Sequence, residues 1–164
     1  MTPRIASASA ADAAGIAALW SGAIRDTDIT FNSVEKTEAD ILALMAQRAE
    51  AGHAFLAVRD GAGVIGFAGY GPFRPGVGYA RTVEHTIFLS DRARGHGLGR
   101  RVMAQIEAHA RAGGAHSIWG GISGTNTDSI AFHEALGFSQ MALLPEVGFK
   151  FGRLMDLVLV RKLL

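Results

Sequence analysis

An acidic residue lies within Thr82–Leu89, a run whose other side chains are mostly apolar or β-branched and which therefore predicts a central strand. Period-two alternation puts Glu84, Thr86 and Phe88 on one face and His85 on the other. A carboxylate on such a strand is costly to bury unless it is paired or functional. Glu84 could form a salt bridge. Alternatively, burial would raise its pKa and suit it to act, directly or through water, as a general base that deprotonates an ammonium. We interpret His85 as a packed or hydrogen-bonded residue.

A turn rich in glycine and arginine, SDRARGHGLGRR at 90–101, follows this strand and precedes a helical pattern. Glycines in such a turn leave backbone N–H groups free to bind one ligand, and the helix dipole adds positive potential. Guanidinium groups bind phosphate oxygens in bidentate fashion. The turn therefore predicts a pyrophosphate site. The alternative is a flexible loop before a basic, solvated helix face, which would have a similar sequence. The candidate binding residues in the turn are Arg92, Arg94, Gly95, His96, Gly97, Leu98, Gly99 and Arg100.

The sequence of the turn matches neither of two common nucleotide-binding motifs. A Rossmann fingerprint begun at Gly95 or Gly97 needs a further glycine where the chain has Arg100 or Val102, and the G-K-[ST] of a Walker A loop is missing. The pattern R-x-x-G-x-G fits, with Arg92 as its first residue. This pattern resembles the pyrophosphate loop of the GNAT N-acetyltransferase superfamily, whose donor is acetyl-CoA.

The segment Asn126–Phe138 resembles the second half of the coenzyme site in that superfamily. Asn126 and Ser129 match the N-x-x-[AS] start of a helix, which the resemblance places against the pantetheine arm of the coenzyme. The superfamily commonly has a tyrosine general acid seven residues after this Asn, where the chain has His133. Imidazole can protonate a leaving thiolate, so His133 is a candidate general acid, with a water molecule as the alternative.

Hydrophobic periodicity and turn residues indicate the elements that position these groups. Strands are expected at Arg4–Ala8, Ala54–Arg59, Val64–Gly71, Thr82–Leu89 and His116–Ile122, and helices after Ser9, Thr37, the glycine turn and Asn126. The order strand, helix, strand over 82–122 indicates a parallel crossover with the glycine turn at the carboxyl end of its first strand, where ligands collect. With the resemblance, we expect an α/β (α+β) fold: a mixed, mostly antiparallel sheet of about seven strands flanked by about four helices.

Composition narrows the classes of function. With 164 residues, 49% of them hydrophobic, the chain is expected to form one domain over 1–164. A net charge of +1 favours neither nucleic acid nor an anionic membrane as a partner. The chain has no cysteine, and its six histidines lack metal-ligand spacing, so no metal is expected. Its N-terminus shows no signal-peptide pattern, which leads us to expect a cytoplasmic protein.

Four motifs narrow the resemblance to one family. They are T-V-E-x-[ST] at 82–86, G-P-[FW] at 71–73, F-H-E-A-L-G-F at 132–138, and V-G-F-K-F-G at 147–152 with Asp156. Together they are similar to phosphinothricin and methionine sulfone or sulfoximine N-acetyltransferases. The resemblance covers nearly the whole chain. It implies that acetyl-CoA donates an acetyl group to the α-amine of a small amino-acid analogue, and that the enzyme is a homodimer.

The family resemblance also implies roles for individual residues. The backbone of Ile87, Phe88 and Leu89 would bind the pantetheine, and an N–H there could polarise the thioester carbonyl. Glu84 would lie by the amine. Phe31, Phe73 and Arg74 would shape the acceptor pocket, with Arg74 binding the substrate carboxylate. The alternatives are an acetyltransferase for polyamines, aminoglycosides or protein amines, and a non-catalytic acyl-CoA-binding module.

Overall fold

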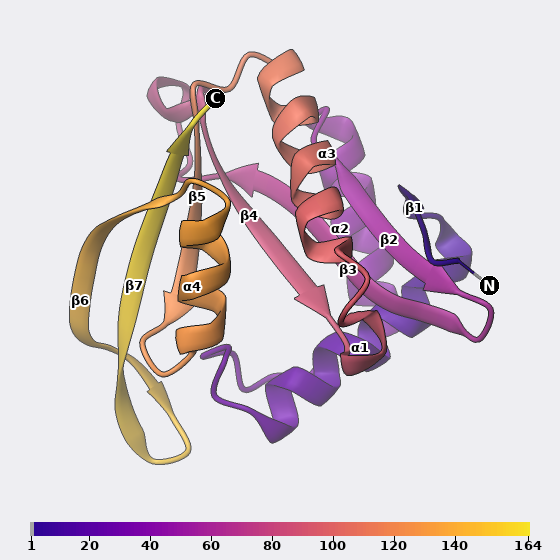
Figure 1. Ribbon diagram of the computed structural model, residues 1–164, viewed down its shortest axis with the longest axis horizontal. Helices are drawn as coiled ribbons and strands as arrows, with labels where there is room; N and C mark the ends of the chain where they lie inside the picture. The colour runs from indigo at the N-terminus through magenta and orange to yellow at the C-terminus, as the bar shows by residue number, and fades with distance from the viewer. Residues whose placement is uncertain (1) are drawn as a thin grey trace.

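A seven-stranded sheet in the order β1-β2-β3-β4-β5-β7-β6 forms the centre of the computed structural model (Figure 1). The structure describes residues 2–164, so the first residue of the domain expected at 1–164 lies outside the described residues. The strands are β1 (Arg4–Ser7), β2 (Phe55–Asp60), β3 (Gly63–Pro72), β4 (Thr82–Leu89), β5 (Ser117–Ser123), β6 (Ser139–Lys150) and β7 (Arg153–Leu163). Neighbouring strands are antiparallel except β4 and β5, which are parallel. The mixed, mostly antiparallel sheet with a parallel crossover is thus confirmed.

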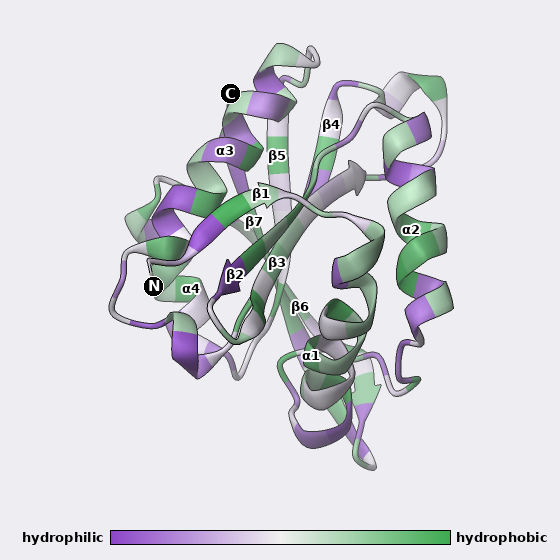
Figure 2. Cartoon of the chain, turned by 90° about the vertical axis from the view of Figure 1, so that its right-hand side faces the viewer, coloured by the Kyte–Doolittle hydropathy of each residue, from purple (hydrophilic) through white to green (hydrophobic). Residues whose placement is uncertain are grey.

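Four helices cover the sheet, two on each face, as Figure 2 shows. They are α1 (Ala13–Asp26), α2 (Glu38–Glu50), α3 (Leu98–Ala112) and α4 (Thr127–Ala135). The expected caps are present: Thr37 Oγ1 accepts a hydrogen bond from Asp40 N at 3.1 Å, and Asp40 Oδ2 accepts one from Thr37 N at 2.8 Å. No helix within residues 2–164 is long and apolar enough to cross a membrane.

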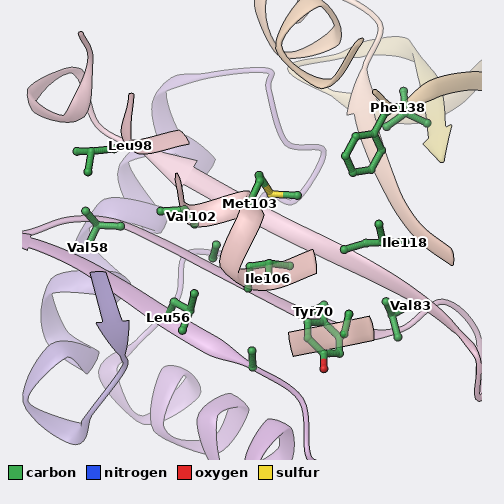
Figure 3. Packing of buried hydrophobic residues seen from close by; sticks show 14 of the residues in the cluster. Leu56, Val58, Tyr70, Val83, Leu98, Val102, Met103, Ile106, Ile118 and Phe138 are labelled. Carbon is green, nitrogen blue, oxygen red and sulfur yellow. The ribbon is translucent and has the colours of Figure 1, made fainter. Parts of the chain in front are cut away.

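The larger core lies between α3 and the sheet (Figure 3). Leu98, Val102 and Ile106 recur every four residues on one side of α3, and each is at most 1% exposed. They pack on inward-facing residues of several strands, among them Val58 and Ile118. A smaller cluster on the opposite face joins α1 and α2 to β2 and β3. Apolar side chains therefore cover both faces of the central strands and hold them in place between the helices.

The two parallel strands separate along their length. Only Thr82–Glu84 of β4 pairs with β5, at Ser117–Trp119, although β4 continues to Leu89. Figure 1 shows β4 and β5 diverging toward their carboxyl ends, with α4 beside the gap. The backbone groups of β4 beyond Glu84 that face β5 therefore have no partner strand on that side, and they are available to a ligand.

Candidate active site

A cavity of about 230 Å³ opens where β4 and β5 diverge. Its walls come from both strands, from α4, and from α1 with the loop that follows it. The structure brings many of the predicted site residues together here, although they are far apart in the sequence. The predicted residues that line the cavity are Phe31, Glu84, Ile87, Phe88, Asn126, Ser129 and His133.

Glu84 lies at the point where the pairing of β4 with β5 ends. Its side chain is open to the cavity, and it is the only carboxylate among the described residues that line it. The surrounding protein raises the pKa of the Glu84 carboxyl above its usual value, and the positive charge of Arg74 opposes this rise in pKa. Within residues 2–164, Glu84 forms no ion pair, so the salt bridge considered from the sequence is not present.

His133 and His85 form a buried pair and line the same cavity as Glu84. Their Nε2 atoms are 2.8 Å apart, and the exposed fractions of the two residues are 2% and 6%. His133 Nδ1 lies 2.7 Å from the backbone oxygen of Ser129, and His85 Nδ1 lies 2.8 Å from that of Trp119. Burial lowers the pKa of both rings. The interpretation of His85 as a packed, hydrogen-bonded residue is confirmed.

The glycine turn borders a second hollow of about 320 Å³. Gly95 and Gly97 have φ values of 78° and 62°, a left-handed conformation that L side chains rarely adopt. At Gly99 the reason for glycine is contact, because an added Cβ would lie 2.8 Å from the Phe132 ring. Within residues 2–164, no backbone acceptor pairs with the N–H of Gly95, His96 or Gly97.

The unpaired N–H groups and the arginines of the turn are suited to bind a pyrophosphate. Free N–H groups of the turn are followed by the first turn of α3, whose own N–H groups have no intrahelical partner. Arg94 and Arg100 line the same hollow and are exposed. Leu89, at the end of β4, also lines it, so the hollow begins where the unpaired part of the strand ends.

Three other predicted residues of the turn do not present their side chains to this hollow. The Arg92 guanidinium pairs with the Asp60 carboxylate, and Arg92 does not line the hollow. His96 is exposed and lines neither cavity. The Leu98 side chain is 1% exposed within the core, so only its backbone can bind a ligand.

Phe73 and Arg74 lie in the loop after β3, outside the cavity that Glu84 lines. The Phe73 ring packs against Trp119 with centroids 5.0 Å apart, and the Arg74 guanidinium lies 5.6 Å from the centre of the Phe73 ring. Arg74 lines a separate hollow of about 410 Å³. The structure therefore divides the predicted acceptor residues between two sides of Glu84.

Several residues of the cavity were not predicted. Gly120 and Gly121 of β5 line it, and an added Cβ at Gly120 would lie 2.7 Å from His85 Cε1. Two glycines inside a strand are a signal of such a close approach. Lys150, 3% exposed, donates from Nζ to the Thr30 oxygen at 2.8 Å and so holds the loop that carries Phe31. Nothing in the local sequence indicated this contact.

Comparison with known proteins agrees with this geometry. The model of the acetyltransferase (GNAT) family matches residues 20–138, which include β4, the glycine turn and α4. The chain belongs to the GNAT acetyltransferase family. Its sheet with the parallel β4-β5 pair and its four helices form a GNAT domain.

Several relatives of this GNAT chain are named for N-acetyltransferase activities. An L-methionine sulfoximine/L-methionine sulfone acetyltransferase of Pseudomonas aeruginosa is 37% identical over 98% of this chain and 94% of its own length. A phosphinothricin N-acetyltransferase of Alcaligenes faecalis is 31% identical over 92% of this chain and 77% of its own. A phosphinothricin acetyltransferase of Sinorhizobium meliloti, solved with acetyl-CoA, superposes with a TM-score of 0.93 at 30% identity, covering 100% of this chain and 89% of its own.

This GNAT protein is therefore an enzyme, an acetyl-CoA-dependent N-acetyltransferase. The relatives are named for small amino-acid analogues. Within residues 2–164, no three His, Cys, Asp or Glu side chains come together as a metal site would require.

Proposed function

We propose that the enzyme acetylates the α-amine of a small amino-acid analogue of the methionine sulfone, methionine sulfoximine or phosphinothricin type. The observation that carries the proposal is the position of Glu84: a carboxylate with a raised pKa lines a cavity of about 230 Å³ next to the unpaired backbone of β4. An ammonium must lose a proton before its nitrogen can attack a thioester carbon. A partly desolvated carboxylate is suited to take this proton near neutral pH.

The free backbone of β4 would align the donor. The groups of Ile87, Phe88 and Leu89 that face the gap would pair with the pantetheine arm, as an added strand does, and one N–H would polarise the thioester carbonyl. The turn from Arg94 to Arg100 would bind the pyrophosphate through N–H groups and guanidinium groups.

Asn126 would contact the same arm from the start of α4. Its Oδ1 accepts a hydrogen bond from Ser129 N at 3.2 Å, which caps the helix and leaves the amide NH₂ for a ligand. Ser129 lies one turn before His133 and lines the cavity with it. The residues assigned to the coenzyme thus lie along one path, from the glycine turn to the point where β4 and β5 part.

The acceptor would lie at Glu84 between Phe31 on one side and Arg74 on the other. Phe31 lines the cavity and packs on β6, where a Cβ added to Gly148 would lie 2.5 Å from its ring. Arg74 is exposed, and its charge acts on the Glu84 carboxyl. A guanidinium here would bind the acceptor carboxylate, and Phe73 would support it by packing between Arg74 and Trp119.

The transfer would be direct. The amine nitrogen, deprotonated by Glu84, would attack the carbonyl carbon of the thioester, and His133 or a water would supply the proton for the departing thiolate. Cysteine is missing from the chain. Ser129 Oγ lies 3.4 Å from His133 Nδ1, but that nitrogen is 2.7 Å from the Ser129 backbone oxygen and must carry a hydrogen there, so it cannot activate the serine as a base and a covalent acyl-enzyme is not proposed.

The β6–β7 hairpin supports the proposal of a homodimer. Strand β6 is an edge of the sheet, and the hairpin carries exposed apolar side chains. These are Met141, Leu143, Val147, Phe149, Phe151, Leu154 and, at the end of β7, Leu163, with exposed fractions of 42–66%. An exposed apolar edge of this kind promotes aggregation of a monomer, whereas an interface with a second copy would bury it.

A thiol-release assay with acetyl-CoA tests the acceptor class. The panel is phosphinothricin, L-methionine sulfone, L-methionine sulfoximine, spermidine, an aminoglycoside and a peptide with a free N-terminus. We expect turnover with the three amino-acid analogues and a product acetylated on the α-amine, identified by mass spectrometry. Turnover with spermidine, the aminoglycoside or the peptide alone would contradict the proposal, and no turnover with any amine would favour a binding module.

A further inference from the structure

The hydrogen bonds of the two buried imidazoles determine how many protons they hold. The backbone oxygens of Trp119 and Ser129 can only accept, at 2.8 Å from His85 Nδ1 and 2.7 Å from His133 Nδ1. Each Nδ1 must therefore carry a hydrogen. A neutral imidazole has one N–H, so two neutral rings would turn unprotonated Nε2 atoms toward each other at 2.8 Å.

One additional proton on the line between the Nε2 atoms satisfies all three contacts. With two protons on the four ring nitrogens, one of the three short contacts joins two lone pairs. With three protons, every contact has a donor and an acceptor. A polar contact left unsatisfied in a buried place is costly, and a hydrogen bond to a charged group is among the stronger ones. Water cannot relieve the mismatch, because the rings are only 2% and 6% exposed.

The surroundings can accommodate one shared charge. Burial disfavours a charge on each ring, and one proton held by two rings spreads that charge. Glu84 supplies the carboxylate of the same cavity. The Phe138 ring packs on both imidazoles and separates them from Lys162, whose charge is paired with Glu107 at 2.7 Å. Arg161 lies farther out, 5.9 Å from the centre of the Trp119 ring.

We propose that His85 and His133 share a single proton between their Nε2 atoms, and that His85 thereby acts as a positioning residue that keeps His133 protonated until the thiolate leaves. The role in turnover rests on the proposed function, whereas the shared proton does not. His85 lines the cavity, but both of its ring nitrogens are engaged, by Trp119 and by His133.

The proton balance of the transfer follows from these contacts. The N–C bond forms, the C–S bond breaks, and its electron pair leaves on sulfur. Ser129 Oγ lies 3.4 Å from His133 Nδ1 and lines the cavity, so its hydroxyl can give a proton to the thiolate and take one from Nδ1. The shared proton then stays on His133 Nε2 and is donated to His85. The ammonium loses two protons through Glu84; one restores the histidine pair and one enters the solvent.

Nuclear magnetic resonance on the wild-type protein without substrate tests the shared proton. Long-range ¹H–¹⁵N spectra report which ring nitrogens are protonated, and His85→Gln and His133→Gln assign the signals. We expect three protons on the four nitrogens of the pair at neutral pH. Two protons, with one ring nitrogen of each residue unprotonated, would overturn the proposal whether or not the enzyme acetylates any amine.

The dependence of kcat on pH tests the role of His85. A Gln at position 85 can still donate to His133 Nε2, which then remains neutral with its ring in place. We expect kcat of His85→Gln to lie about tenfold below that of the wild type at neutral pH, and to fall less than the wild-type kcat one to two pH units above neutrality, where the wild type loses its shared proton. The matched control is His116→Gln, an exposed histidine outside both cavities. An equal loss of kcat at all pH values would assign His85 a structural role and contradict the proposal.

Discussion

At the scale of residues, the site depends on what surrounds each polar group. Glu84 and His85 are consecutive, yet one carboxyl is open to the cavity and the neighbouring imidazole is buried. The alternation of side chains along β4 causes this separation. The surrounding protein partly desolvates the Glu84 carboxyl and so raises its pKa, whereas the positive charge of Arg74 lowers that pKa. Burial of Glu84 and the charge of Arg74 therefore together set the pKa of the proposed base.

The raised pKa of Glu84 predicts an acid limb in the pH profile. A general base acts in its deprotonated form, so kcat/KM falls as the pH drops through the pKa of Glu84, which lies above the usual value for glutamate. In Arg74→Ala the opposing charge is lost, the pKa of Glu84 rises further, and the limb moves to higher pH. Arg74→Lys keeps the charge and is the matched control. A limb that does not move in Arg74→Ala would mean that this charge does not act on the base.

At the scale of elements, the glycine turn and the parting of β4 from β5 together form the proposed coenzyme path. The turn adopts its shape because Gly95 and Gly97 have positive φ values. The strands part because pairing ends after Glu84 and Trp119. Both features leave backbone N–H groups unpaired, and Arg94 and Arg100 line the hollow at the turn, so a negatively charged donor is proposed to bind there.

A substitution in the turn predicts weaker coenzyme binding. Gly97→Ala places a Cβ on a residue with φ 62°, a strain of about 1–2 kcal/mol that the loop relieves by moving. We expect the Kd for acetyl-CoA, measured by calorimetry, to rise about tenfold. Gly22→Ala in α1 is the control, because an added Cβ there meets nothing within 4 Å. An unchanged Kd in Gly97→Ala would mean that the turn does not bind the coenzyme.

Elements could be predicted from the sequence where the signal is local. The four-residue spacing of Leu98, Val102 and Ile106 predicted α3, and β4 has the bounds expected for it. The first strand, expected to end at Ala8, ends at Ser7, where its pairing with β2 ends. Helix caps such as Thr37 involve side chains three residues apart and were therefore also predicted.

Contacts across the fold could not be predicted in this way. Arg92 was assigned to the turn by its neighbours, but its guanidinium pairs with Asp60, 32 residues earlier. His85 meets His133 across 48 residues. Lys150 reaches the Thr30 oxygen across 120 residues. Such partners are decided by how the strands are ordered in the sheet, and no local pattern records that order.

At the scale of the whole molecule, the two ends of the sheet differ. The β1 end is a strand of four residues, whereas the β6 end is a strand of twelve with exposed apolar side chains on its hairpin. The hairpin also holds the loop of the cavity, through Lys150 and through Gly148 against Phe31. Assembly through β6 and shaping of the acceptor side would therefore be linked.

The oligomeric state tests this link. Phe149→Glu places a charge within the exposed apolar side chains of the hairpin, and burying an unpaired charge is costly. Light scattering coupled to size-exclusion chromatography should give a dimer for the wild type and a monomer for Phe149→Glu. Val34→Glu, at a residue that is 71% exposed outside the hairpin, should remain a dimer. A monomeric wild type would contradict the proposed assembly.

The central claim is that Glu84 deprotonates the α-amine in the cavity between β4 and β5. The most direct measurement is kcat/KM of Glu84→Gln with the best acceptor of the panel at neutral pH, alongside the Kd for acetyl-CoA. Gln preserves the shape of the side chain and removes its basicity. We expect a loss of about 100-fold or more in kcat/KM with an unchanged Kd. A kcat/KM equal to that of the wild type would contradict it.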